Sequence, residues 1–432
     1  MTPPPQTPSP RASLTSWKQI AHHLSVSERT AQKWERERGL PVHRLPGPRG
    51  RVYAVPVELD AWLCGQGQEL RPSGRPVPRW PGPVWTLVTG LCALALFAVV
   101  VAGAVLRKVH QTGPVAWQIK GRDLITTDAK ERVLWRYVPP DGWSIWNQPD
   151  SRGWQSPLPV ISELPGPGIH SLVFGEVSSQ HLHRLRCVGP DGRLLWTHVP
   201  EGVARVPEQA YEGPWYLRQL AVIPALPGER QKIAVVWQHA THFPSLVQVL
   251  DHRGRLERQY WHSGHFLALH VQPGPGFGRP LLYLAGIANG YRQGLLLVLD
   301  PQRMTGASRE ENTRLQILDQ DEPVEVARIL FPRTRLNQAL APFNSAVRIQ
   351  QRNDDLAVEV EELSDLSQPH LRAATLFYLL TPDLRLKSLD IGDGVPYFYR
   401  RLDGPDRFSP DALAQEITSL PPPRVLTPWQ GD

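Results

Sequence analysis

The sequence predicts a multidomain chain that combines a small α+β module, one transmembrane helix and a large all-β domain. Three observations lead to this prediction. Apolar residues recur at helical spacing in a short segment near the N-terminus, residues 84–106 contain no charged side chain, and the residues beyond them alternate short apolar runs with turns. A chain of 432 residues is long enough for two or three domains.

The N-terminal segment has two short helical patterns. Residues 1–13 are rich in Pro, Ser and Thr, and we expect them to be disordered. Ser16 is expected to cap a helix that runs to about His23, and Ser27 is expected to cap a second helix that runs to about Glu37. Two short helices joined by a tight turn form a helix-turn-helix.

A basic hairpin and a third helix complete this module, which we place at residues 14–64. The hairpin is expected from residues 42–45 and 51–55, which flank a Pro- and Gly-rich tip, and the helix from residues 57–63. The segment from Trp17 to Leu63 resembles the winged helix-turn-helix of the MerR/excisionase superfamily. The residues that carry the resemblance, besides the hairpin and the last helix, are Ile20, Ala21, Leu24, Val26, Ser27, Thr30, Trp34 and Glu35.

The resemblance implies that the second helix enters the major groove of double-stranded DNA and that the hairpin acts as a wing on the backbone or minor groove. Two residues depart from the family pattern. Ser25 stands where the family usually has glycine in the turn, and Ala31 is smaller than the usual branched residue. The DNA-facing residues implied by the resemblance are Ser27, Arg29, Gln32, Lys33 and Arg36 of the helix, and Arg44, Arg49 and Arg51 of the wing.

Positive charge is concentrated in the same part of the chain. Residues 1–82 hold 12 Lys and Arg against 6 Asp and Glu, whereas the remaining residues hold 35 of each. This asymmetry indicates an anionic partner, either nucleic acid or a membrane surface. The alternatives are a solvated basic face, and a helix-turn-helix used as a protein-interaction module.

A transmembrane helix is predicted at residues 84–106, after a Gly-, Pro- and Arg-rich linker at residues 65–83. An α-helix of that length reaches roughly 35 Å, and a hydrocarbon core is about 30 Å thick. The run begins too far from the N-terminus for a secretory signal peptide. The basic residues that flank it are nearly balanced, so its orientation follows from the module: a DNA-binding module must face the cytoplasm.

The large domain, residues 107–432, contains an internal repeat. Residues 128–135 resemble residues 190–196, 61 positions later by their tryptophans, and residues 251–256 recur at a similar interval. Residues 377–383 have the same strand-then-turn form but do not align firmly with the others. Units of this kind resemble the blades of PQQ-like or FG-GAP-like β-propellers, although the calcium loop of FG-GAP repeats is missing. A β-sandwich or a barrel is the alternative.

No catalytic, metal or cofactor motif is found. The three cysteines, Cys64, Cys92 and Cys187, lie in different parts of the chain, so neither a disulfide framework nor a structural zinc is expected. The histidine pairs lack further ligands at metal-site spacing. A nucleophile elbow, a His-Glu-x-x-His motif and a phosphate-binding loop are all missing, so we predict that the protein is not an enzyme.

Together the parts predict a membrane-tethered one-component transcriptional regulator of the inner (cytoplasmic) membrane. Its N-terminus would bind DNA in the cytoplasm, and its β-domain would sense an unknown extracytoplasmic ligand or protein. A homodimer would read two half-sites. The alternative is an envelope interaction or scaffold protein whose β-domain binds protein or cell-wall polymer.

Overall fold

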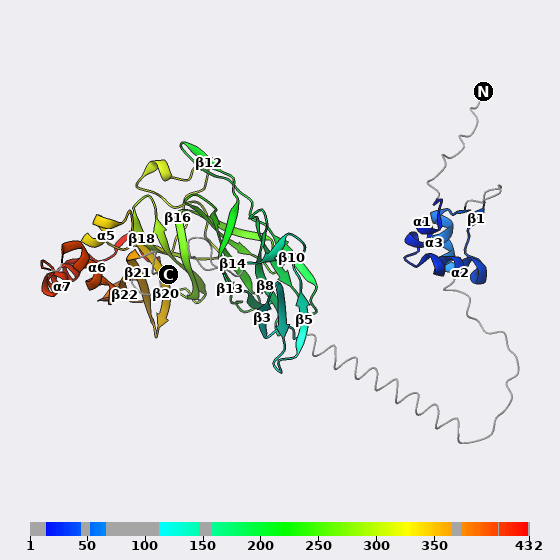
Figure 1. Ribbon diagram of the computed structural model, residues 1–432, viewed down its shortest axis with the longest axis horizontal. Helices are drawn as coiled ribbons and strands as arrows, with labels where there is room; N and C mark the ends of the chain where they lie inside the picture. The colour runs from blue at the N-terminus through cyan, green and yellow to red at the C-terminus, as the bar shows by residue number, and fades with distance from the viewer. Residues whose placement is uncertain are drawn as a thin grey trace, which may run out of the picture. The chain divides into compact units, whose positions relative to one another are not determined.

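The computed structural model describes residues 14–44, 52–65, 112–146, 157–364, 373–404 and 406–430 (Figure 1). The chain divides into two compact units, residues 1–92 and residues 93–432. Within the described ranges, none of the helices has the length and apolar character needed to cross a membrane. The segment predicted to do so, residues 84–106, lies outside the described residues, as do the N-terminal residues 1–13 and residues 66–83 of the linker.

The N-terminal unit has the elements that the sequence predicts, in the predicted order. Its two strands pair antiparallel, with Arg44 opposite Val52. Ser16 and Ser27 are the N-caps, because their hydroxyls accept hydrogen bonds from the N–H groups of Gln19 (3.3 Å) and Thr30 (3.2 Å). The elements are α1 (Trp17–His23), α2 (Glu28–Arg38), β1 (His43–Arg44), β2 (Val52–Tyr53) and α3 (Pro56–Gly65).

A small apolar core holds these elements together. Residues from all three helices and from the second strand contribute, and the rings of Trp34 on α2 and Trp62 on α3 lie 5.8 Å apart. Ala31, the small residue of α2, is fully buried. The buried apolar residues are Ile20, Ala21, Leu24, Ala31, Leu40, Val52, Ala54 and Leu59.

The described residues of the second unit are all-β apart from short helices, which confirms the predicted fold class of this part. Its strands form successive antiparallel meanders, which we number 1 to 5 along the chain. Meander 1 contains β3 (Ala116–Lys120), β4 (Asp123–Thr127) and β5 (Val133–Tyr137). Meander 2 contains β6 (Trp143–Ile145), β7 (Val160–Gly166), β8 (Ile169–Ser178), β9 (His183–Val188) and β10 (Leu194–His198). A separate hairpin, β11 (Ala204–Val206) and β12 (Gln209–Tyr211), follows.

Meanders 3 and 4 share one long strand, β16 (Leu256–Pro273). Its first half pairs with β15, and its second half pairs with β17. Meander 3 contains β13 (Trp215–Ile223), β14 (Lys232–His239), β15 (Pro244–Leu250) and the first half of β16. Meander 4 contains the second half of β16, β17 (Pro280–Ala288), β18 (Gln293–Leu299), β19 (Ala327–Leu330) and the C-terminal strand β24 (Arg424–Thr427).

Meander 5 and four short helices are the remaining elements that the structure describes in this unit. The meander contains β20 (Ser345–Arg352), β21 (Asp355–Ser364), β22 (Ala373–Leu380) and β23 (Leu386–Ile391). The helices are the 3₁₀-helix η1 (Thr313–Leu315), α5 (Arg335–Leu340), α6 (Gly394–Asp403) and α7 (Pro410–Ser419).

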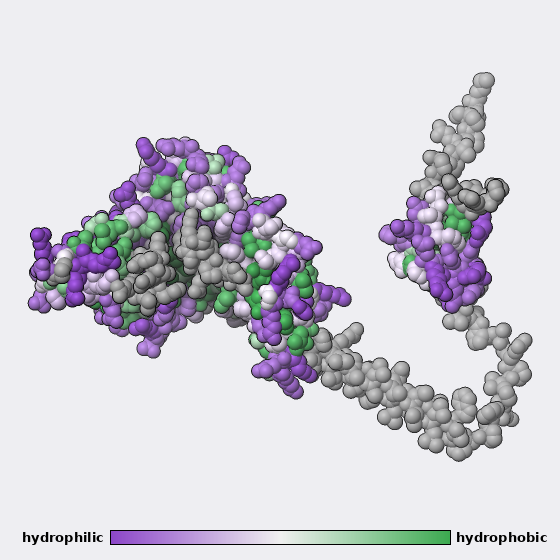
Figure 2. Space-filling model, viewed as in Figure 1, coloured by the Kyte–Doolittle hydropathy of each residue, from purple (hydrophilic) through white to green (hydrophobic). Residues whose placement is uncertain are grey.

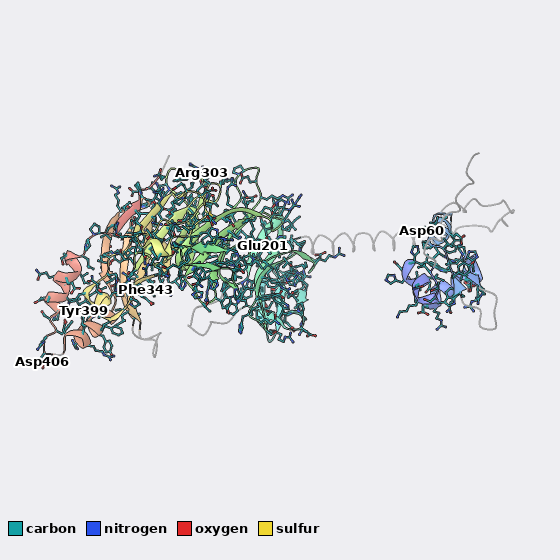
Figure 3. All side chains as sticks on the ribbon, turned by 90° about the horizontal axis from the view of Figure 1, so that it is seen from above. Asp60, Glu201, Arg303, Phe343, Tyr399 and Asp406 are labelled. Atoms are coloured by element: carbon teal, nitrogen blue, oxygen red, sulfur yellow. The ribbon has the colours of Figure 1, made fainter. Side chains whose placement is uncertain are left out.

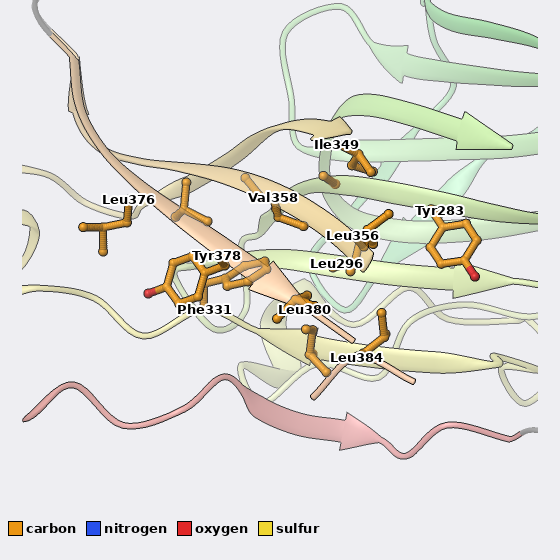
Figure 4. Close-up of a cluster of buried hydrophobic side chains, with 14 of the residues drawn as sticks. Tyr283, Leu296, Phe331, Ile349, Leu356, Val358, Leu376, Tyr378, Leu380 and Leu384 are labelled. Atoms are coloured by element: carbon orange, nitrogen blue, oxygen red, sulfur yellow. The ribbon is translucent and has the colours of Figure 1, made fainter. Parts of the chain in front are cut away.

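Each meander packs face to face on the next through an apolar layer. The layers join meanders 1 and 2, 2 and 3, 3 and 4, and 4 and 5. Every residue of β15 and of β17 is buried, because both faces of these strands are covered. Figure 4 shows the layer between meanders 4 and 5, where Tyr283 and Leu296 lie near Leu356.

This stacking of antiparallel meanders is propeller-like, since propeller blades pack on one another in the same way. Meander 1 and meander 5 lie at opposite ends of the unit in Figure 1. The described meanders therefore form a row, whereas a closed ring would bring the first and last together.

The repeat seen in the sequence corresponds to one recurring turn. In turns 128–132, 189–193, 251–255 and 381–385, the N–H of the first residue donates to the carbonyl of the fifth, at 2.8–3.0 Å. The fourth residue of each turn has a positive φ. The turn at 381–385 therefore belongs to the same series, which the sequence alone did not establish. In meander 4 the equivalent connection, after Asp300, is extended to residue 326.

Candidate functional sites

The exposed face of α2 is the candidate nucleic-acid interface. Arg29, Gln32, Lys33 and Arg36 follow the spacing i, i+3, i+4 and i+7, which places them on one face of the helix. All except the half-buried Gln32 are exposed. Figure 2 shows that the visible surface of the N-terminal unit is mostly hydrophilic. The face therefore presents side chains of the types that can contact phosphates and base edges in a major groove.

The internal contacts of Lys33 and Arg36 are weak, so these side chains are available to a phosphate. Lys33 lies 3.8 Å from Glu37, and both side chains are about 60% exposed. The Nε of Arg36 donates to the carbonyl of Gln32 at 3.4 Å. Exposed ion pairs are worth at most about 1 kcal/mol, so a phosphate can replace Glu37 at little cost. Ser27 differs, because its hydroxyl caps α2 and also lies 2.8 Å from the hydroxyl of Thr30.

Arg44 has an intramolecular partner that the sequence did not reveal. Its guanidinium donates to both carboxylate oxygens of Glu35, at 2.9 and 3.2 Å. Both contacts are made by the same nitrogen, Nη2, and they join β1 to α2. Arg49 and Arg51, the other residues predicted for the wing, lie outside the described residues.

Two carboxylates of α3 hold the other elements of the module. Asp60 lies 2.8 Å from the Nε2 of His23 at the end of α1, and Glu58 lies 2.7 Å from the Nε2 of His43 on β1. These pairs join residues far apart in the chain, so no periodicity signals them. They make α3 the element to which both α1 and the hairpin are attached.

Ser25 adopts a left-handed conformation, with a φ of +55°, and its side chain is exposed. Because this region favours glycine, Ser25→Gly is expected to stabilise the module by about 0.5–1 kcal/mol. Slower hydrogen exchange of the α1 and α2 amides in the full chain would measure the gain. The control is Ser27→Gly at the N-cap, where φ is −74°. Equal or faster exchange in Ser25→Gly would contradict the prediction.

A buried polar chain joins the extended connection of meander 4 to β16. The Oγ of Ser308 is 3.1 Å from the Nδ1 of His262 and 2.7 Å from the Oε1 of Glu310. The Nε2 of His262 is 3.0 Å from the carbonyl of Ile287, so Nε2 carries a proton. Burial lowers the pKa of His262 to about 3, which leaves Nδ1 as an acceptor.

The single hydroxyl proton of Ser308 cannot serve both neighbours. If it is donated to His262, Glu310 must carry a proton and donate to Ser308. Burial raises the pKa of Glu310 to about 7, which agrees with a protonated carboxyl. The second oxygen of Glu310 is buried without a hydrogen-bond partner within the part of the chain that the structure describes. The three side chains therefore form a neutral network at slightly acid pH. As the pH rises and Glu310 loses its proton, Glu310 and the Nδ1 of His262 compete for the hydroxyl proton of Ser308.

The stability of the β-rich unit is expected to fall between pH 4.5 and about pH 7, because the folded state holds the Glu310 proton more tightly than the unfolded state, whose pKa is near 4.5. The loss attributable to this group is about 3 kcal/mol. Urea unfolding of the wild-type chain and Glu310→Gln at several pH values would measure it. The difference between the two should change with pH in this window, and a constant difference would contradict the assignment.

Comparison with known proteins identifies no family. No protein-family model matches the chain, and no curated protein matches it. Among solved structures, the Dos1 propeller is similar at 10% identity, with a TM-score of 0.36, over 63% of this chain and 54% of that one. This chain thus spans about half the length of that structure.

Two further solved structures are similar at the same low level. A protein of unknown function from Bacteroides caccae shares 10% identity, with a TM-score of 0.23, over 66% of this chain and 93% of that one. A DUF4221-family member from Bacteroides vulgatus shares 11% identity, with a TM-score of 0.28, over 64% and 76%. These scores establish no shared fold with any one of them, so the propeller-like description rests on the meanders and their stacking.

Proposed function

We propose that this protein is a membrane-tethered one-component transcriptional regulator. The observation that supports the proposal is the exposed face of α2, on which Arg29, Gln32, Lys33 and Arg36 lie together, in a module whose helices, caps and hairpin follow the predicted order. Cations and amides on the second helix of a helix-turn-helix are the groups that bind DNA phosphates and base edges. The kinship with the MerR/excisionase superfamily is part of this proposal.

The membrane tether and the topology belong to the same proposal. Residues 84–106 would cross the inner membrane, with the N-terminal unit in the cytoplasm and the β-rich unit outside. A ligand or partner of the β-rich unit would change dimerisation and so the affinity of two recognition helices for two half-sites. A reporter fused to the C-terminus tests the topology, and a C-terminus found in the cytoplasm would rule out this arrangement.

The DNA-binding part is tested by selecting genomic fragments with the full chain over a salt series. A regulator is expected to enrich particular fragments and to bind them more weakly as salt rises. The triple variant Arg29→Ala, Gln32→Ala and Arg36→Ala should lose the preference, because each good base contact contributes about 1–3 kcal/mol of discrimination. The control is Lys18→Ala, an exposed cation on α1.

Two outcomes would contradict the proposal. Selectivity that survives the triple change would show that α2 is not the recognition helix. Binding that is equally strong on all fragments would favour the scaffold alternative, in which the basic module only attaches the protein to nucleic acid.

A further inference from the structure

A cleft of about 670 Å³ lies over meander 4, at the connection that departs from the recurring turn. Three segments distant in the sequence border it: the hairpin between β17 and β18, at Tyr291; the extended connection, residues 300–326; and the C-terminal segment, at Leu426 and Gln430. The volume falls in the range of about 300–1,000 Å³ that is usual for sites of small organic ligands. Extended connections on a rigid scaffold commonly carry binding sites.

The floor of the cleft is a fixed ion pair. Arg328 lies 3.4 Å from Glu325, and their side chains are only 5% and 4% exposed. The hydroxyl of Tyr260 donates to one oxygen of Glu325 at 2.5 Å, and the hydroxyl of Thr427 donates to the other. Arg328 also donates to the carbonyl of Arg309 at 2.6 Å. The two charges of the floor therefore pair with each other, and both carboxylate oxygens of Glu325 accept hydrogen bonds from within the protein.

The remaining acidic groups of the cleft are also neutralised. Asp300 accepts from Arg279 at 2.7 Å, and Glu322 pairs with Arg309. Arg303 also lines the cleft, is exposed, and has no ion pair among the described residues. Figure 3 shows Arg303 at the surface of the β-rich unit. Among the described residues the cleft therefore has one uncompensated positive charge at its rim, and its lining includes the apolar residues Phe277, Val324 and Leu426.

We propose that this cleft binds a small organic anion, whose carboxylate pairs with Arg303 and whose apolar part contacts Phe277, Val324 and Leu426. Arginine is suited to this role because its planar guanidinium binds carboxylates in a bidentate manner. A ligand there would connect the three bordering segments. That the ligand is the signal of the regulator rests on the proposed function, whereas binding itself does not.

The test is titration calorimetry of the full chain in detergent micelles. The probes are benzoate, phenylacetate and hexanoate, each compared with its uncharged amide. At least one carboxylate is expected to bind with a Kd of about 1 mM or tighter. The matching amide should bind at least about tenfold more weakly, because it lacks the charge-assisted hydrogen bonds to Arg303.

Two variants assign the site. Arg303→Gln is expected to weaken binding of the carboxylate by at least about tenfold. Arg193→Gln is the matched control, since Arg193 is 85% exposed on a turn of meander 2, away from the cleft, and it should bind as the wild type does. The proposal is overturned if none of the three carboxylates binds, if the amides bind equally well, or if Arg303→Gln binds normally. Since no DNA is present, these outcomes are independent of the DNA-binding test.

Discussion

Glu176→Gln is expected to destabilise the β-rich unit by about 3–5 kcal/mol. The Glu176 side chain on β8 is fully buried and lies between two arginines of β9, with the Nε of Arg184 at 2.6 Å and the Nε of Arg186 at 2.8 Å. It also accepts a hydrogen bond from the hydroxyl of Tyr137, on β5 of meander 1, at 2.6 Å. Removing the one negative charge leaves two largely buried guanidiniums repelling each other, and it weakens the attachment of meander 1 to meander 2.

Urea unfolding of the full chain, followed by tryptophan fluorescence, would measure this effect as a lower midpoint. The matched control is Glu359→Gln. Glu359 also pairs with an arginine on the neighbouring strand, Arg348 at 3.3 Å, but that arginine is 62% exposed. Loss of such a pair should change the stability by no more than about 1 kcal/mol. Similar midpoints for the two variants would show that the buried Glu176 ion pairs contribute no more to stability than the exposed pair.

Gly254→Ala is expected to destabilise the protein by about 3 kcal/mol, through two causes that add. Gly254 has a φ of +75°, a conformation that costs an alanine about 1–2 kcal/mol. A Cβ at this position would also lie 2.6 Å from the ring of Trp196 on meander 2, which would have to move. Forcing extra volume into a packed site typically costs another 1–3 kcal/mol, roughly.

Gly228→Ala separates the two causes. Gly228 has a similar φ of +83°, and a Cβ there would meet nothing within 4 Å. Its loss of stability, measured by the same urea unfolding, should therefore reflect the backbone alone and should be about 1–2 kcal/mol. If Gly254→Ala costs no more than Gly228→Ala, the contact between the recurring turn and the tryptophan of the preceding meander contributes nothing to stability.

The sequence predicts those features that depend on neighbours in the chain. The caps Ser16 and Ser27 stand directly before their helices, and the alternation of strands and turns identifies the β-rich unit. The face of α2 follows from helical spacing alone. The span at residues 84–106 and all the assigned contacts with DNA stay predictions.

Features that depend on contacts between distant residues are beyond such reasoning. The spacing of Glu35 and Arg44 does not indicate their ion pair, so the sequence assigns Arg44 to DNA without its internal partner. The sequence does not align the turn at 381–385 with the others, because its left-handed position holds Leu384, where two of the other turns have glycine. The cleft over meander 4 requires three segments that come together only in the folded chain.

The continuous strand β16 limits which meanders of this architecture can be deleted, duplicated or exchanged. Its 18 residues run without a loop from meander 3 into meander 4. Because no loop separates the two meanders, neither can be removed, duplicated or exchanged without cutting a strand. Meander 1, by contrast, ends before β6 begins, and the chain can be cut there without dividing a strand. Residues 215–330 are therefore expected to be inherited together, and they should open and close in hydrogen exchange as one cooperative block.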